Sequence, residues 1–86
     1  MEFELAELVK HNGAALLGTA MRKHETVMAY AKLLRKGDVA PPIIVSTDGR
    51  RILNGLVRVC AAVHVGRQFI TGTQPTLGGS RGYSLA

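Results

Sequence analysis

Two consecutive prolines followed by three β-branched residues limit most strongly what this chain can fold into. Pro41 and Pro42 cannot lie inside a helix and favour extended backbone before them, whereas the run Ile43 to Val45 suits a strand. Asp48-Gly49 is a tight-turn signal, and Ile52-Leu53 can form a short return strand. This stretch therefore predicts a strand, a turn and a second strand.

A helix from Leu56 to Val65, ending at Gly66, is expected to follow these strands. Asn54 can cap it, and Gly55 lets a ligand approach the backbone closely. The first amides of a helix are unpaired donors that favour anions, phosphate above all. Arg58 in the first turn adds a positively charged guanidinium whose paired N–H donors suit a phosphate. We therefore predict a phosphate or anion pocket at Asn54–Arg58. The alternative for Arg58 is an ion pair with Asp38, Asp48 or Glu25.

The remaining segments complete a small α+β fold, a mixed sheet with two main helices, in one domain over residues 1–73. Residues 1–10 alternate as a short strand would, although Leu5, Leu8 and Val9 also fall at helical spacing. We prefer the strand, with a turn at His11-Asn12-Gly13 after it. Residues 14–20 form either a helical turn or a packed loop. A helix is expected over residues 26–36, which could begin as early as Met21, and the last strand is expected over residues 67–73, after the second helix. Residues 74–86, rich in glycine, are predicted to form a flexible tail.

Charge and composition indicate the cellular compartment of the protein and the kind of partner it would bind. The chain has 86 residues, a net charge of +5 and a pI of about 10.0, which favours an anionic partner such as nucleic acid, a nucleotide or an acidic protein surface. Cys60 is the only cysteine, so no internal disulfide can form, which is typical of the reducing cytoplasm. The acidic N-terminus does not resemble a signal peptide, and no apolar run is long enough to span a bilayer. These features predict a soluble cytoplasmic protein.

The helix over residues 56–65 is apolar almost all round. Such helices are usually buried on more than one side, and this short chain has little material to cover one. A homodimer in which a second copy covers one face is one interpretation. The other is that the strands and the first helix cover it.

The order of these features resembles the ParB/sulfiredoxin-like superfamily, especially its small ParB-like nuclease branch. The matching residues are Arg22-Lys23-His24 before a helix, Gly37 at its end, the strand Pro42–Val45, the turn Asp48-Gly49, the motif Asn54–Arg58, Ala61-Ala62 and Gly66. The resemblance implies binding of nucleotide or nucleic-acid phosphates by Gly55, Arg58 and the helix start. It also implies that Arg22, Lys23 and His24 face the same pocket.

The motif departs from the superfamily at the positions that carry its chemistry. Leu56 stands where the resemblance implies a histidine or a reactive cysteine, and Val57 beside it cannot act as an acid, a base or a metal ligand. The three histidines show no metal-ligand spacing. We therefore expect a non-catalytic phosphate-binding protein, such as a phage- or plasmid-encoded regulator, with Arg50 and Arg51 as further phosphate contacts. The resemblance implies no cofactor except, at most, a bound nucleotide.

Two alternatives remain open at this point. The first is an inhibitor or adaptor module that uses its apolar helix to bind a host protein or a second copy of itself. The second is a ParB-like nuclease, which depends on the resemblance alone.

Overall fold

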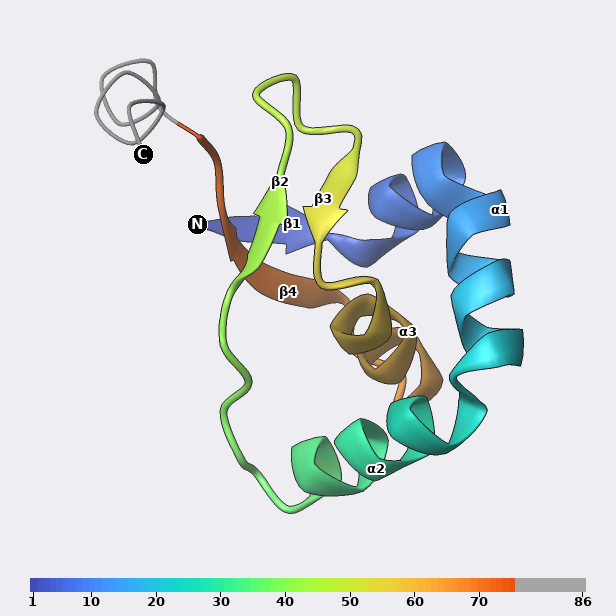
Figure 1. The fold of residues 1–86 in the computed structure, drawn as a ribbon. Coiled ribbons are helices and arrows are strands. Elements are labelled where there is room, and N and C mark those ends of the chain that lie inside the picture. Colours follow the sequence, from blue (N-terminus) through green and yellow to red (C-terminus); the bar gives the residue numbers. More distant parts are fainter. Residues whose placement is uncertain (76–86) are drawn as a thin grey trace, which may run out of the picture.

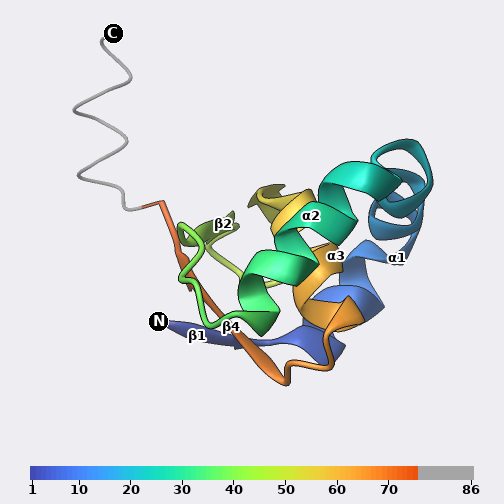
Figure 2. The ribbon, with the colours of Figure 1, turned by 90° about the horizontal axis from the view of Figure 1, so that it is seen from below.

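The computed structural model describes residues 1–75, which form a four-stranded mixed sheet and three helices. The strands are β1 (Glu2–Glu4), β2 (Ile43–Val45), β3 (Ile52–Asn54) and β4 (Phe69–Thr73), and the helices are α1 (Leu5–Arg22), α2 (His24–Arg35) and α3 (Leu56–His64). The three helices gather at one side of the strands (Figures 1 and 2). The predicted α+β class with a mixed sheet is confirmed, with α1 as a long additional helix.

The sheet has the order β1-β4-β2-β3. Strand β4 is antiparallel to β1 and parallel to β2, with Phe3 opposite Ile70 and Ile43 opposite Gly72. Strand β3 is antiparallel to β2 at the other edge. The predicted strand–turn–strand unit is thus confirmed, and it joins the last predicted strand in one sheet.

The core is aliphatic, because the chain has few aromatic residues and no tryptophan. Leu8, Ile43, Val45 and Val59 are the largest fully buried side chains, and they come from α1, β2 and α3. Helix α3 packs against α1, α2 and the sheet, so its buried residues are covered within one chain. Val63 is the large apolar residue of α3 that remains exposed, at 44%.

The predicted turn at residues 11–13 is wrong, because the chain continues there as helix α1. Asn12 leaves helical geometry (φ −129°, ψ 20°) and kinks the helix. Its amide nitrogen donates to the carbonyl oxygens of Leu8 at 2.8 Å and Arg50 at 2.7 Å, and its amide oxygen accepts from the backbone N–H of Ile52 at 3.0 Å. A buried polar side chain is tolerated when it is fully hydrogen-bonded. Asn12 therefore joins α1 to β3 and does not end the helix.

The first strand is also shorter than predicted, because β1 ends at Glu4 and residues 5–22, including the segment 14–20, form α1. The predicted boundaries from α2 to β4 hold within a few residues. Helix α2 begins at His24, directly after the junction residue Lys23, and the chain turns at Gly37 with φ +89°. Gln74, the first residue of the predicted tail, is attached to the β2–β3 turn, since its side-chain amide donates to the Ser46 carbonyl oxygen at 2.9 Å. The rest of the predicted tail lies outside the described residues from position 76 on. Within residues 1–75, no helix combines the length and the apolar character that crossing a membrane requires.

Candidate functional site

The turn from β3 into α3 is built on Gly55. This residue is the N-cap of α3 and has φ +110°, a left-handed conformation that side chains rarely adopt. A Cβ atom here would also lie 2.6 Å from Cγ2 of Ile43 in the core. The predicted cap, Asn54, is wrong: it ends β3, and α3 has no side-chain cap. The first amides of α3 are therefore not covered by a capping side chain.

Arg58 is held by neutral groups. Its Nη1 donates to the carbonyl oxygens of Pro41 at 2.9 Å and Pro42 at 2.8 Å, and its Nη2 makes a long 3.4 Å contact with Oδ1 of Asn54. The ion pairs considered for it from the sequence are not formed: in residues 1–75 the one cation–carboxylate contact within 4.0 Å joins His11 and Glu7, at 3.9 Å. The guanidinium is thus fixed in position with its charge uncompensated by a carboxylate.

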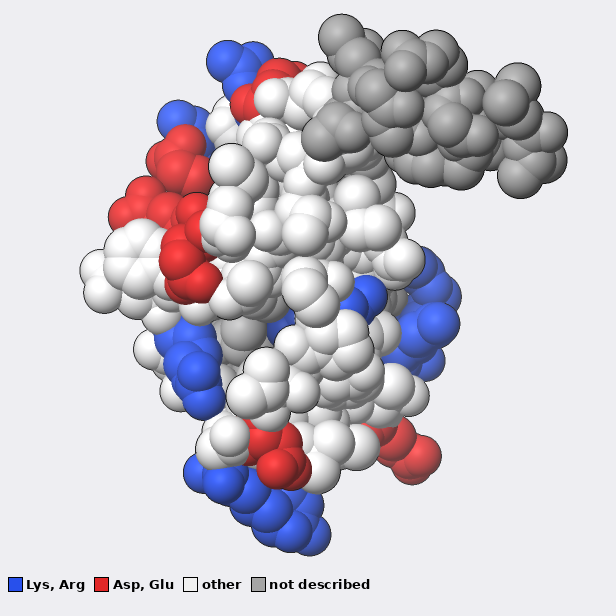
Figure 3. Space-filling view, turned by 90° about the vertical axis from the view of Figure 1, so that its left-hand side faces the viewer, with Lys and Arg blue, Asp and Glu red and all other residues white. Residues whose placement is uncertain are grey.

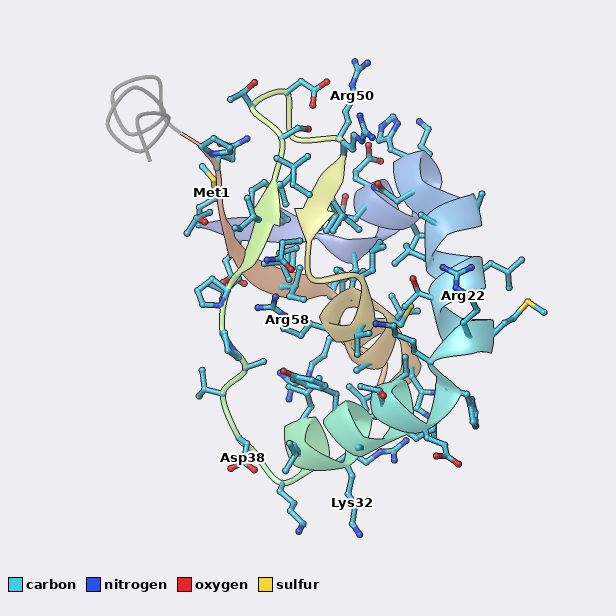
Figure 4. All side chains as sticks on the ribbon, in the orientation of Figure 1. Met1, Arg22, Lys32, Asp38, Arg50 and Arg58 are labelled. Carbon is cyan, nitrogen blue, oxygen red and sulfur yellow. The ribbon has the colours of Figure 1, made fainter. Side chains whose placement is uncertain are left out.

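An open pocket of about 470 Å³, which we call the α3 pocket, lies in front of this helix start. It brings together five predicted residues: Asn54, Gly55, Arg58, Arg22 and Lys23. Figure 4 shows Arg22 at the end of α1 and Arg58 in the first turn of α3. The remaining lining residues are Thr19, Thr26, Tyr30, Leu53, Leu56 and Val57. The space in front of the α3 amides is therefore open, with cations from two different helices around it.

Arg50 and Arg51 lie apart from this pocket, beyond the β2–β3 turn. They line a second pocket of about 430 Å³, the turn pocket, together with the α1 residues His11, Asn12, Gly13, Ala14 and Ala15. Both arginine side chains are exposed, and Figure 4 shows Arg50 at that end of the molecule. The predicted phosphate contacts thus fall into separate groups.

The turn that carries these arginines is fixed by Asp48. Its carboxylate accepts from the hydroxyl of Ser46 at 2.5 Å and from the backbone N–H of Arg50 at 3.0 Å. The Ser46 hydrogen bond, and then that of Arg50, lowers the pKa of Asp48 below its ordinary value. The carboxylate therefore stays ionised at neutral pH and partly offsets the positive charge at this end.

His24 does not line the α3 pocket, although it follows Arg22 and Lys23 in the chain. It lines an apolar groove of about 380 Å³ between α1, α2 and α3. The apolar walls of this groove come from Val9, Leu16, Leu17, Ala20, Val27, Met28, Cys60 and Val63, with His64 at its edge. Sequence reasoning did not identify this groove, because it forms only where three helices meet.

Arg67 is a further cation that sequence reasoning missed. It lines a pocket of about 240 Å³ behind the Gly37–Pro42 segment, together with Arg58, Glu2 and Asp38. In the space-filling view of this face, Lys or Arg atoms lie inside a central hollow (Figure 3). The guanidinium of Arg67 donates to the carbonyl oxygen of Leu34 at 3.0 Å near the end of α2. Glu2 and Asp38 also line this pocket, although neither forms a contact within 4.0 Å with Arg58 or Arg67.

Cys60 has a packing role. Its thiol donates to the carbonyl oxygen of Leu16 at 3.3 Å, and burial raises its pKa above the ordinary value, which disfavours the reactive thiolate. Among the described residues, no three His, Cys, Asp or Glu side chains lie close enough together to hold a metal ion.

Comparison with known proteins found no match: no protein-family model, no curated protein and no solved structure matches this chain. The resemblance to the ParB/sulfiredoxin-like superfamily therefore stays a prediction from the order of the motifs.

Proposed function

We propose that this protein binds phosphate groups of a nucleotide or nucleic acid in the α3 pocket, without catalysis. The observation that carries the proposal is the meeting of Arg22, Lys23 and Arg58 around an open helix start. These cations come from positions far apart in the sequence, and no carboxylate of the described residues pairs with them. Fixed guanidinium groups and free amides are the donors that phosphate oxygens prefer.

The geometry of Arg58 supports this role. Two carbonyl oxygens hold its Nη1, so little side-chain freedom would be lost when an anion binds. Carbonyl acceptors are neutral, so the positive charge remains available to a ligand. The basic character of the chain, with a net charge of +5, would attract such a ligand from solution.

Salt dependence of binding tests the proposal. Fluorescence anisotropy with a labelled single-stranded oligonucleotide should show affinity falling steeply with salt, and the variant Arg22→Ala/Lys23→Ala should reduce the log–log slope by about 1.4. The matched control is Lys32→Ala/Arg35→Ala, which removes the same charge from exposed positions on α2 outside the pocket. The control should keep the slope of the unmodified protein.

Two outcomes would contradict the proposal. One is no binding of any single strand, duplex or nucleoside triphosphate at low salt. The other is an equal loss in both double variants, because this would mean that only the net charge matters. Circular dichroism of each variant would confirm that the fold is retained.

A second candidate function is a protein-interaction module, either for a host protein or for a second copy of this chain. The apolar groove favours it, because Leu17 beside the groove floor is 63% exposed and Met21, one turn further along α1, is 74% exposed. Exposed apolar side chains that gather around a groove are typical of interfaces. Light scattering over a range of concentrations tests for a homodimer, which Leu17→Ser/Met21→Ser should dissociate. A monomer at every concentration would contradict self-association.

A further inference from the structure

The α3 pocket and the turn pocket lie along one surface, which we call the basic seam, between α1 and the segment that runs from β3 into α3. At one end, Asn12 of α1 bonds to Arg50 and Ile52, directly before and within β3. At the other end, Thr19 and Arg22 of α1 line the same pocket as Asn54. The two pockets therefore follow each other along α1. Figure 1 shows β3 beside this helix.

Cations stand at both ends of the basic seam. Arg22, Lys23 and Arg58 line the α3 end, whereas Arg50 and Arg51 line the turn end. The side chains of Arg50 and Arg51 take no part in the hydrogen bonds of the turn, since those bonds use their backbone groups. Asp48 lies close to Arg50 and offsets part of its charge, so the turn end is the weaker of the two.

The α1 residues between the two ends have small, uncharged side chains, and the guanidinium of Arg22 reaches back over one of them, Gly18. Ala15, Gly18 and Thr19 follow one another along the same stripe of α1, at positions i, i+3 and i+4. A Cβ atom on Gly18 would lie 2.8 Å from Nη1 of Arg22, so the Arg22 side chain folds back along α1 over this glycine. Leu53 of β3, 51% exposed, offers an apolar surface beside it. A flexible chain with regularly spaced charges and flat apolar bases would fit such a surface.

The spacing of the ends sets the size of the ligand. From His11 to Arg22 the helix rises by about 16 Å, at about 1.5 Å per residue. One strand of stacked nucleic acid places a phosphate about every 3.4 Å, so about five nucleotides cover this length and fewer suffice when the strand is extended. A single phosphate group cannot contact both ends.

We propose that the basic seam binds a single strand of nucleic acid over several nucleotides, with phosphates at both ends, and that a free nucleotide is not its main ligand. This inference rests on the proposed phosphate binding and assigns its ligand class. A single strand is favoured over a duplex, because its unpaired bases can lie against the exposed apolar side chain of Leu53. Arg50 and Arg51 thereby become phosphate contacts of the same ligand as Arg22 and Lys23.

The dependence of binding affinity on oligonucleotide length tests this inference. Anisotropy or calorimetry would compare single strands of about two and about eight nucleotides, as DNA and as RNA, with a duplex of the longer sequence and with a nucleoside triphosphate. We expect the longer single strand to bind at least about tenfold more tightly than the dinucleotide. Arg50→Ala/Arg51→Ala should remove most of that gain and leave dinucleotide affinity within about twofold, because the dinucleotide reaches the α3 end alone.

Controls separate this inference from the phosphate proposal. Arg22→Ala/Lys23→Ala should weaken both lengths, and Lys32→Ala/Arg35→Ala should affect the longer strand less than Arg50→Ala/Arg51→Ala does. If the dinucleotide binds through Arg22 and Lys23 but length brings no gain, or Arg50 and Arg51 prove neutral, the seam proposal is overturned and phosphate binding survives. Tighter binding of the duplex would also overturn it. If no probe depends on Arg22 and Lys23, both proposals fail.

Discussion

The two sides of helix α1 face surfaces of opposite chemistry. The side toward β3 carries Ala15, Gly18, Thr19 and Arg22 and forms the basic seam with its two groups of cations. The side toward the other helices carries Leu16, Leu17 and Ala20 and forms the apolar groove. One helix thus separates the surface that we propose for nucleic acid from the apolar groove.

The two sides are also held in place by different forces. The seam depends on directional contacts, namely the three hydrogen bonds of Asn12 and the left-handed Gly55. The groove side depends on apolar packing, with Leu16 buried in the core. Directional contacts fail when one atom is removed, whereas apolar packing tolerates many exchanges. Single substitutions should therefore separate the two surfaces.

The largest effect is expected from Gly55→Ala, at the end of the seam. The added Cβ would meet Ile43 at 2.6 Å, and alanine is strained at φ +110°. Strain and overpacking together should lower the free energy of unfolding by about 2–4 kcal/mol, measured by urea denaturation. Gly13→Ala is the matched control: nothing lies within 4 Å of its added Cβ, and in a helix alanine should stabilise by about 0.5–1 kcal/mol. Equal effects of the two changes would contradict this account.

Asn12→Ala is expected to have the next largest effect. It leaves the buried N–H of Ile52 and the carbonyl of Arg50 without their partner, which should cost about 2 kcal/mol of unfolding free energy. Asn54→Ala, on an exposed residue with one long contact, should cost less than about 0.5 kcal/mol. Hydrogen exchange at Ile52 would show whether β3 separates from α1. Unchanged exchange there would contradict the role given to Asn12.

A smaller effect should show that the two sides are independent. Leu17→Ser/Met21→Ser alters only exposed positions of α1, so unfolding free energy should change by less than about 0.5 kcal/mol per site. Affinity for the longer single strand should stay within about twofold, since neither residue lines the seam pockets. A loss of nucleic-acid binding comparable to that of Arg22→Ala/Lys23→Ala would contradict the separation.

The smallest effect concerns Cys60 on the groove side. Because burial raises its pKa in the folded state, its contribution to stability is complete below the ordinary value of 9.0 and is lost as pH rises toward the folded pKa. Urea denaturation at about pH 8 and about pH 10 should therefore show that the free energy of unfolding falls more between these pH values in the unmodified protein than in Cys60→Ala. An equal fall of the unfolding free energy in both proteins would mean that burial does not raise the pKa of Cys60.

Much of the region from Pro41 to Gly66 could be predicted because its signals are local. Proline, β-branched runs and glycine at turns restrict the backbone wherever they occur, and β2, β3 and α3 formed close to their expected places. The first helix could not be predicted in this way. Its buried stripe of Leu5, Leu8, Asn12, Leu16 and Thr19 contains two polar residues and a glycine neighbour, which resemble a turn until their partners on β3 are known.

The candidate site likewise contains features that the sequence predicts and features that depend on the tertiary structure. The sequence by itself determined an aliphatic α+β domain, an excess of positive charge, and a glycine-started helix with Arg58 in its first turn. Only the tertiary structure decided that Arg22 and Lys23 join that helix start, that His24 turns to the apolar groove, and that Arg50 and Arg51 extend the seam. Backbone conformation is restricted by neighbours in the chain, whereas a binding surface depends on which side of each helix packs against residues distant in sequence.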